Sequence, residues 1–255
     1  MSIIRPFKGI RPRADLASAI AALPYDVYNS EEAREIVAAE PKSFLQIDRA
    51  ETLLPKGTNP YSEAVYKTAS ETLNRMIDEG SFLQDKEPCY YLYALTMNGR
   101  TQTGLVGCAS IDDYCNNVIL KHENTLEAKE QDRIRHIDAC SAQTGPIFLA
   151  YRADKKLGEI IKNVRLTPEV YDFTSDDGIR HEVWRIDKMS TIVDISKIFE
   201  AIPHLYIADG HHRAASAVKV GLKRRAEDLH FSGTEEYNYF LSVLFPADEL
   251  AIYDY

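Results

Sequence analysis

The stretch Leu205-Tyr-Ile-Ala-Asp-Gly-His-His-Arg-Ala-Ala-Ser-Ala-Val218 carries the strongest structural signal in the chain. Its first three residues form a short apolar run that favours a β-strand, and residues 214–218 favour a helix. Gly210 lies between the two and allows a tight backbone turn that other residues resist. The sequence therefore predicts a strand, a glycine turn and the start of a helix.

The predicted turn crowds four polar side chains at one end of a helix. Asp209, His211, His212 and Arg213 all flank the glycine. A helix that begins here directs unpaired backbone N–H groups and the positive end of its dipole at the turn, and this arrangement binds phosphate. An arginine fork suits two phosphate oxygens, and a carboxylate beside a phosphate is typical of a bridging Mg²⁺. The alternative is that Asp209 only caps the helix and the next residues are exposed.

Composition excludes several classes of protein. The 255 residues include 30 Lys and Arg against 39 Asp and Glu, and the net charge of −9 opposes non-specific binding to nucleic acid. No apolar run approaches the roughly twenty residues that span a bilayer. The start, Met1-Ser-Ile-Ile-Arg-Pro6, lacks the features of a signal peptide. We therefore expect a cytoplasmic protein that binds neither nucleic acid nor membrane.

The rest of the chain predicts a mixture of helices and strands. Apolar residues at spacings of three and four predict a long helix over 61–79, and Asn98-Gly99 predicts a hairpin between strands 89–97 and 101–110. Ser175-Asp-Asp-Gly178 predicts a second hairpin, with strands over 170–173 and 179–186. The other predicted strands are 3–11, 43–48, 145–152, 240–245 and 250–255, and the other predicted helices are 15–23, 31–40, 125–139 and 192–199.

Local signals predict where two of the helices begin or end. Asn29 precedes a helix and Glu32 follows three residues later, which is the pattern of a capping box. Gly221 is expected to lie just beyond the C-terminus of the helix that follows the turn.

Because hairpins and helices alternate irregularly, we predict an α+β fold with a mixed, largely antiparallel sheet and flanking helices. We expect an N-terminal α/β part over residues 1–165 and a nucleotide-binding part over 166–255, packed closely as one unit. The chain ends on the apolar run 250–255, so we expect the protein to continue past Tyr255. A strand left unpaired there would be an edge that pairs with another copy, which predicts a homodimer.

Further polar groups are candidate site residues. Lys121 and His122 precede a charged helix and are expected to neutralise a substrate phosphate or carboxylate, although a solvated helix face is the alternative. The run Pro24-Tyr-Asp-Val-Tyr-Asn29 is either a plain loop before a helix or a lip that presents an aromatic and an acidic side chain to a ligand. Glu182 lies on a predicted strand and is a candidate general base, with an ordinary surface position as the alternative.

Four motifs together resemble the domain of unknown function 1015 family. They are Ala208-Asp-Gly-His-His-Arg-Ala-Ala215, Pro24-Tyr-Asp-Val-Tyr28, Lys121-His-Glu-Asn-Thr125 and Gly145-Pro-Ile-Phe-Leu-Ala-Tyr151, and the resemblance covers essentially the whole chain. Within it, residues 206–217 are similar to the phosphate-binding turn of the ParB and sulfiredoxin superfamily, which includes free-serine kinases. Sulfiredoxin chemistry is excluded because the turn has no cysteine.

The resemblance implies nucleotide binding at a ParB/sulfiredoxin-like strand, turn and helix. It implies that Arg213 and the helix N-terminus hold phosphates, and that Asp209 lies near Mg²⁺ or the acceptor hydroxyl. It also implies that His211 and His212 orient the transferred group.

We therefore predict a phosphotransferase that uses ATP or ADP with Mg²⁺ on a small hydroxylated metabolite such as free serine. Asp209, His212 and Glu182 are the expected catalytic residues, and Asp209 is the expected metal ligand. The alternative is a non-catalytic nucleotide-binding regulatory module of ParB-like type. The residues expected to bind the nucleotide are Gly210, His211, Arg213, Lys121 and His122.

Overall fold

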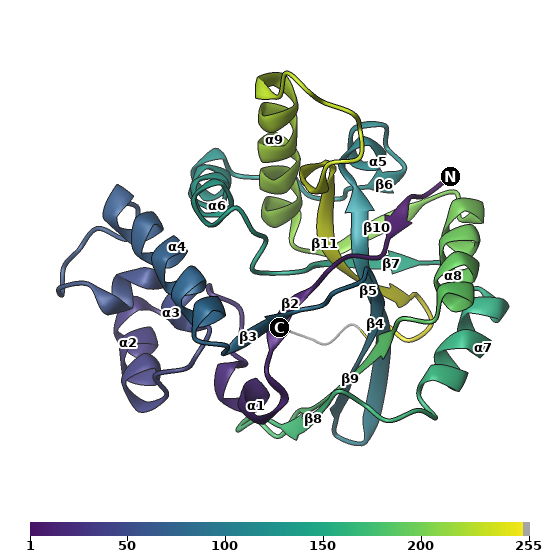
Figure 1. The fold of residues 1–255 in the computed structure, drawn as a ribbon, viewed down its shortest axis with the longest axis horizontal. Coiled ribbons are helices and arrows are strands. Elements are labelled where there is room, and N and C mark those ends of the chain that lie inside the picture. Colours follow the sequence, from purple (N-terminus) through teal and green to yellow (C-terminus); the bar gives the residue numbers. More distant parts are fainter. Residues whose placement is uncertain (252–255) are drawn as a thin grey trace.

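The computed structural model describes residues 1–251 of the chain. Alternating apolar residues build a nine-stranded sheet at its centre (Figure 1). Only β6 with β10 and β7 with β11 are parallel pairs among the described strands; the other pairs are antiparallel. The predicted fold class, a mixed and largely antiparallel sheet with flanking helices, is therefore confirmed. In sheet order the strands are β6 (Ile119–Leu120), β10 (Leu205–Asp209), β7 (Ile147–Tyr151), β11 (Tyr239–Pro246), β5 (Arg100–Ser110), β4 (Tyr90–Met97), β9 (Arg180–Ile186) and β8 (Tyr171–Thr174), and β1 (Ile4–Arg5) pairs with β5.

The two predicted hairpins are both present. Asn98 and Gly99 join β4 to β5 with φ values of 51° and 77°, which is the left-handed backbone that an Asn-Gly turn supplies. Gly178, with φ of 80°, ends the turn between β8 and β9. Local turn chemistry therefore sets the register of the β4–β5 and β8–β9 pairs.

Helices lie on both sides of this sheet (Figure 1). On one side are α7 (Lys155–Val164) and α8 (Met189–Ala201), and on the other are α6 (Glu127–Cys140) and α9 (His211–Glu227). The main hydrophobic core lies between them and draws on residues from both of the expected parts of the chain, including Leu92 and Leu149 as well as Trp184 and Leu205.

A helical lobe sits beside α6 (Figure 1). Its own small core contains Ile47, Met76 and Phe82, together with Cys140 at the end of α6. The predicted capping box is present, because the Asn29 side chain accepts from the N–H of Glu32, whose carboxylate accepts from the N–H of Asn29. The elements here are η1 (Ala14–Leu16), α1 (Ala17–Ile20), α2 (Ser30–Ala39), α3 (Leu45–Asp48), η2 (Ala50–Leu53) and α4 (Glu63–Asp78), with a two-stranded sheet of β2 (Ile10–Pro12) and β3 (Phe82–Gln84).

Several element predictions are wrong. The predicted strand 43–48 is wrong, because Leu45–Asp48 form the helix α3 and residues 43–44 are not in a strand. A short apolar run fits either structure, and here Leu45 and Ile47 are buried from a helix. The predicted strand 3–11 is split into β1 and the start of β2. The last predicted strand, 250–255, has no strand at 250–251, and its residues 252–255 lie outside the described part.

The predicted position of Gly221 is wrong, because this residue lies inside α9 and not beyond its end. It lies where α9 passes close to the backbone of another segment. A Cβ at this position would lie 2.4 Å from the carbonyl oxygen of Tyr237. Glycine is needed here because a side chain would clash with that carbonyl group, and not because the backbone is left-handed. The remaining short helices, α5 (Ile111–Cys115) and η3 (Glu236–Asn238), both contact α9.

This close approach predicts that Gly221→Ala lowers the free energy of unfolding by about 1–3 kcal/mol, which is typical of overpacking. Gly158→Ala in α7 is the matched control, because nothing lies within 4 Å of its added Cβ. There the higher helix propensity of alanine should stabilise by about 0.5–1 kcal/mol. Urea unfolding of both variants measures the difference, and equal shifts in the same direction would contradict the packing argument.

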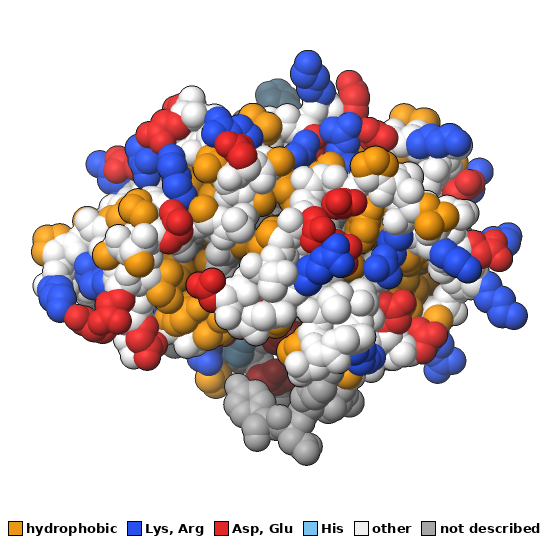
Figure 2. Space-filling model, turned by 90° about the horizontal axis from the view of Figure 1, so that it is seen from below, with side chains coloured by type: hydrophobic (Ala, Val, Ile, Leu, Met, Phe, Trp, Pro, Cys, Tyr) orange, Lys and Arg blue, Asp and Glu red, His pale blue; other side chains and the backbone are white. Residues whose placement is uncertain are grey.

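None of the helices within residues 1–251 is both long and apolar enough to cross a membrane. On the face shown in Figure 2, Lys and Arg side chains alternate with Asp and Glu side chains. That face therefore carries no extended surface of one charge.

Candidate functional site

The predicted strand, turn and helix are present around Gly210. β10 ends at Asp209, α9 begins at His211, and Gly210 between them has φ of 89°, in the region that favours glycine. No side chain of the described residues caps the N-terminus of this 17-residue helix. Its first backbone N–H groups are therefore open toward the turn.

Arg213 lies over this helix end. Its Nη2 donates to Oδ2 of Asp209 at 2.7 Å, and its Nη1 donates to the carbonyl oxygen of Pro146 at 2.5 Å. A Cβ on Gly210 would lie 3.1 Å from Nε of Arg213, so only glycine leaves ordinary room for the guanidinium. The two bonds hold a positive charge above the open N–H groups, and they also engage the carboxylate of Asp209.

The two histidines of the turn have different surroundings. Nε2 of His212 accepts a hydrogen bond from the backbone N–H of Leu126 at 3.0 Å, so this side chain anchors the preceding loop to α9. His211 is only 4% exposed and its Nδ1 lies 3.5 Å from Oε2 of Glu123. Burial lowers the pKa of His211, and the neighbouring His122 lowers it further.

A cavity of about 430 Å³, here called the turn cavity, begins at Asp209 and Arg213 and extends between the sheet and the helical lobe. Its wall is mainly apolar and aromatic. Phe148 and Phe245 stack in it with ring centroids 4.4 Å apart. The cavity thus joins a charged end to an apolar body, as ligand pockets commonly do.

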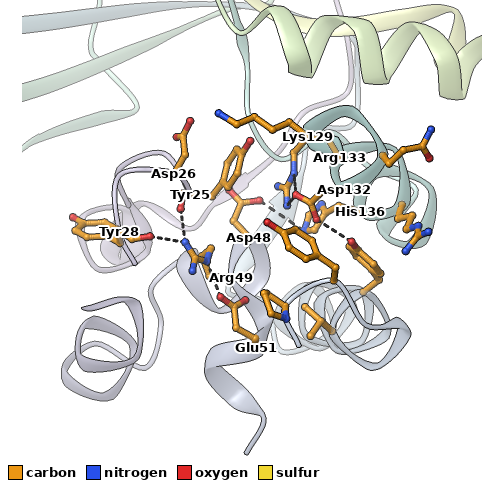
Figure 3. A pocket seen from close by; sticks show the side chains of 16 residues that line it. Tyr25, Asp26, Tyr28, Asp48, Arg49, Glu51, Lys129, Asp132, Arg133 and His136 are labelled. Carbon is orange, nitrogen blue, oxygen red and sulfur yellow. Dashed lines mark hydrogen bonds and ion pairs between the residues drawn. The ribbon is translucent and has the colours of Figure 1, made fainter. Parts of the chain in front are cut away.

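A second cavity of about 480 Å³, here called the lobe cavity, adjoins the first (Figure 3). The side chain of Arg133 lies between the two, is 9% exposed, and pairs with Asp132 at 2.7 Å. Its guanidinium lies 4.0 Å from the centroid of the Tyr25 ring. Burial raises the pKa of Tyr25. The residues common to both cavities are Tyr25, Asp48, Arg133 and His136.

Arg49 holds the loop that carries Tyr25 (Figure 3). Its Nη1 donates to the carbonyl oxygens of Tyr25 at 2.9 Å and Tyr28 at 2.5 Å, while Nε donates to Glu51 at 2.8 Å. The loop 24–29 therefore both leads into α2 and supplies the walls of two cavities. Sequence reasoning missed Arg49 and Arg133, because no local pattern distinguishes a buried arginine from a surface one.

A third cavity of about 400 Å³, here called the loop cavity, lies on the His211 side of the turn. β6 and β10 are parallel, so the loop after β6 and the turn after β10 meet at the same edge of the sheet. This brings Lys121 and His122 to the turn, with the ring of His122 4.4 Å from that of His211. Its lining residues are Tyr114, Lys121, His122, Glu123, Asn124, Thr125 and His211.

Glu182 is not brought to the turn. Side chains alternate along β9, so Glu182 and its neighbour His181 point to opposite faces of the sheet, and only His181 lines the turn cavity. Glu182 pairs instead with Arg180 at 3.2 Å. His181 bonds to the Tyr93 hydroxyl at 2.7 Å through Nδ1 and to Ser175 Oγ at 2.9 Å through Nε2, and burial lowers its pKa.

Within residues 1–251, no group of three or more His, Cys, Asp or Glu side chains is arranged to hold a metal ion. A Mg²⁺ at the turn would therefore take most of its ligands from phosphates and water, which is common for this ion.

The family model described as "Protein of unknown function (DUF1015)" matches residues 4–255 of this chain. The chain therefore belongs to that family. Neither the curated proteins nor the solved structures give a match.

Proposed function

We propose that this protein is a nucleotide-dependent phosphotransferase that transfers a phosphoryl group from ATP or ADP to a small hydroxylated metabolite. The observation that carries the proposal is the open N-terminus of α9 beneath the guanidinium of Arg213. Phosphoryl transfer needs positioning and charge neutralisation more than covalent chemistry, and a helix N-terminus with an arginine supplies both.

The turn cavity supports the nucleotide part of this proposal. Its apolar and aromatic wall suits a nucleoside, and its charged end at Arg213 suits the phosphates. The similarity of residues 206–217 to the turn of the ParB and sulfiredoxin superfamily, which includes free-serine kinases, supports the same assignment. A Mg²⁺ that enters with the nucleotide would neutralise the phosphate charge, and the exposed carboxylate of Asp209 could reach it only by sharing its bond to Arg213.

A non-catalytic nucleotide-binding regulatory module is the second candidate. It is favoured by the state of the three side chains expected to be catalytic. Asp209 binds Arg213, Nε2 of His212 accepts from a backbone N–H, and Glu182 lies on the other face of the sheet. None of the three is free at the turn within the described part of the chain.

Phosphorus NMR separates the two candidates. The protein is incubated with ATP or ADP, Mg²⁺ and a panel of hydroxylated metabolites that includes free amino acids. A new phosphomonoester signal that depends on protein and on one acceptor supports a phosphotransferase. Nucleotide binding without a product from any acceptor supports the regulatory module.

A further inference from the structure

The lobe cavity and the turn cavity share a wall. Four residues line both cavities, and among them are Asp48 at the end of α3 and Arg133 on α6 (Figure 3). Asp48 also lines the turn cavity together with Arg213, the arginine at the N-terminus of α9. A molecule in the lobe cavity can therefore approach a phosphate in the turn cavity across this shared wall.

A short segment of chain links Asp48 to Arg213. Oδ1 of Asp48 accepts a hydrogen bond from the hydroxyl of Thr144 at 2.6 Å, and the carbonyl oxygen of Pro146 accepts one from Arg213 at 2.5 Å. Thr144 and Pro146 are two residues apart, so their Cα atoms are separated by at most about 7.6 Å. Gly145 between them lies against the side chain of Arg213. The carboxylate and the guanidinium are thus held to the same short stretch of the cavity wall.

The carboxylate of Asp48 keeps one oxygen free. Its side chain is 13% exposed, and no Lys or Arg among residues 1–251 pairs with it. Nε2 of His136 lies 3.9 Å from Oδ1, but it donates to the carbonyl oxygen of Ile47, and burial lowers the pKa of His136, so the ring is neutral. Oδ2 of Asp48 accepts no hydrogen bond within the described part of the chain and is not buried. This oxygen is therefore accessible to a ligand.

The charges around the lobe cavity suit a zwitterion. In the part of the chain that the structure describes, four carboxylates and four Lys or Arg side chains line this cavity. Two of each form ion pairs within the wall, Glu51 with Arg49 and Asp132 with Arg133. Charged groups without such a partner favour a ligand of complementary charge. Those left without an ion pair to Lys, Arg, Asp or Glu among residues 1–251 are Asp26, Asp48, Lys129 and Arg135.

We propose that the lobe cavity binds the acceptor, a hydroxylated amino acid, and that the acceptor hydroxyl donates to Oδ2 of Asp48, which acts as the general base. This inference rests on the proposed phosphotransferase function. An aspartate accepts the proton of the substrate hydroxyl in protein kinases as well. The inference places the general base at Asp48 in place of Glu182, which the sequence had suggested and which faces away from the turn cavity.

The proposed reaction is balanced in atoms and electrons. The acceptor oxygen attacks the terminal phosphorus of the nucleotide, and its proton passes to Oδ2 of Asp48. The new oxygen–phosphorus bond forms as the bond to the bridging oxygen breaks, and that oxygen leaves with its electron pair on the shortened nucleotide. The guanidinium of Arg133 lies on the shared wall, where it would neutralise charge on the transferred group.

Asp48→Asn tests the base, because asparagine keeps the shape of the side chain and can still accept from Thr144. Loss of a general base should lower kcat by about 100-fold or more, while calorimetry should show unchanged affinity for ATP or ADP. Asp194→Asn is the matched control, because Asp194 is exposed on α8 and lines neither cavity. An unchanged kcat in Asp48→Asn would overturn the base assignment and leave the phosphotransferase intact. Nucleotide affinity that falls as much as kcat would also overturn it, since Asp48 would then hold the nucleotide or its Mg²⁺.

The class of acceptor is tested with molecules that carry one charge or both. Serine, threonine and homoserine carry both charges, whereas ethanolamine lacks the carboxylate and glycolate lacks the ammonium group. We expect the best of the three amino acids to exceed the other two probes in kcat/KM by about tenfold or more, the usual effect of one charge-assisted contact. Lys129→Ala should raise the KM for that amino acid by a similar factor, and Lys197→Ala on α8 should not. Equal kcat/KM values for all five molecules would contradict a zwitterion site.

Binding without turnover separates failure of this inference from failure of the proposed function. Each of the three amino acids is titrated into protein that already contains ADP and Mg²⁺, and backbone amide NMR follows the signals. We expect those of residues 129–136 on α6 to move more than those of α7 and α8. If they move but no acceptor is ever phosphorylated, the phosphotransferase and the base assignment are both wrong and the amino-acid site stands. If they stay fixed with every amino acid, the acceptor site is wrong even where phosphoryl transfer occurs.

Discussion

Asp85→Ala is expected to lower the free energy of unfolding by about 3–5 kcal/mol, the usual cost of breaking a buried ion pair. The side chain of Asp85 is 4% exposed. It accepts hydrogen bonds from Nε and Nη2 of Arg11 at 3.0 Å, from Nη1 of Arg185 at 3.0 Å and from the hydroxyl of Tyr91. Alanine would remove the acceptor of the buried Tyr91 hydroxyl and leave Arg11 with only Tyr171 and Arg185 with only Asp187. The contact also joins β2 to β4 and β9, so its loss should loosen the small sheet.

Urea unfolding measures this effect against Asp15→Ala. Asp15 pairs with Arg13, but its side chain is 63% exposed, so removal of this solvent-screened pair should change the free energy of unfolding far less than removal of Asp85. Equal losses in the two variants would contradict a special role for the Asp85 cluster.

The same carboxylate predicts acid sensitivity. Burial alone would raise the pKa of Asp85, but hydrogen bonds from Arg11 and Tyr91 outweigh it and lower the pKa to about 2. A carboxyl group with a lowered pKa contributes its stability fully above the pKa of the unfolded chain, near 3.8, and loses it as the pH falls toward 2. The stability difference between wild type and Asp85→Ala should therefore be constant near neutral pH and shrink between pH 4 and 2. A difference independent of pH across this range would refute the assignment.

Arg213→Ala is expected to weaken nucleotide binding by about 1.5–3 kcal/mol, which is roughly 10- to 150-fold in Kd. The reason is the loss of a charge-assisted fork above the N-terminus of α9. The fold should tolerate the change, because its partner Asp209 has a side chain that is 75% exposed. Isothermal titration with ATP and with ADP measures the difference.

Lys197→Ala is the control for this experiment, because Lys197 is exposed on α8 and lies outside the three cavities. Lys219 on α9 is unsuitable as a control. Its ammonium group pairs with the buried carboxylate of Glu130, so its removal would disturb the packing of α6 against α9. Equal nucleotide affinity in wild type and Arg213→Ala would rule out phosphate binding by this arginine.

Features that depend on a few adjacent residues could be predicted from the sequence. The glycine turn at Gly210, the Asn98-Gly99 hairpin and the capping box of Asn29 each follow from backbone chemistry at one site. The helix α3 and the position of Gly221 could not be predicted in this way. Both depend on contacts with residues far away in the sequence. The helix α3 packs into the lobe core, and Gly221 lies against the carbonyl oxygen of Tyr237.

The site shows the same division. The sequence located the polar turn and its second cluster at Lys121 and His122, and the parallel pairing of β6 with β10 brings them together. The sequence alone does not predict which of two adjacent side chains faces a cavity. His181 and Glu182 differ by the face of β9, and His211 and His212 by the face of α9. These choices depend on sheet order and helix orientation, which no local pattern records.

The central claim is that the N-terminus of α9 binds the phosphates of a nucleotide. Backbone amide NMR during titration of ATP or ADP with Mg²⁺ tests it most directly. We predict that the amide signals of residues 210–213 move more than those of α7 and α8, and that adenosine, which lacks phosphate, leaves them in place. Nucleotide titrations that shift signals elsewhere while those of 210–213 stay fixed would contradict the claim.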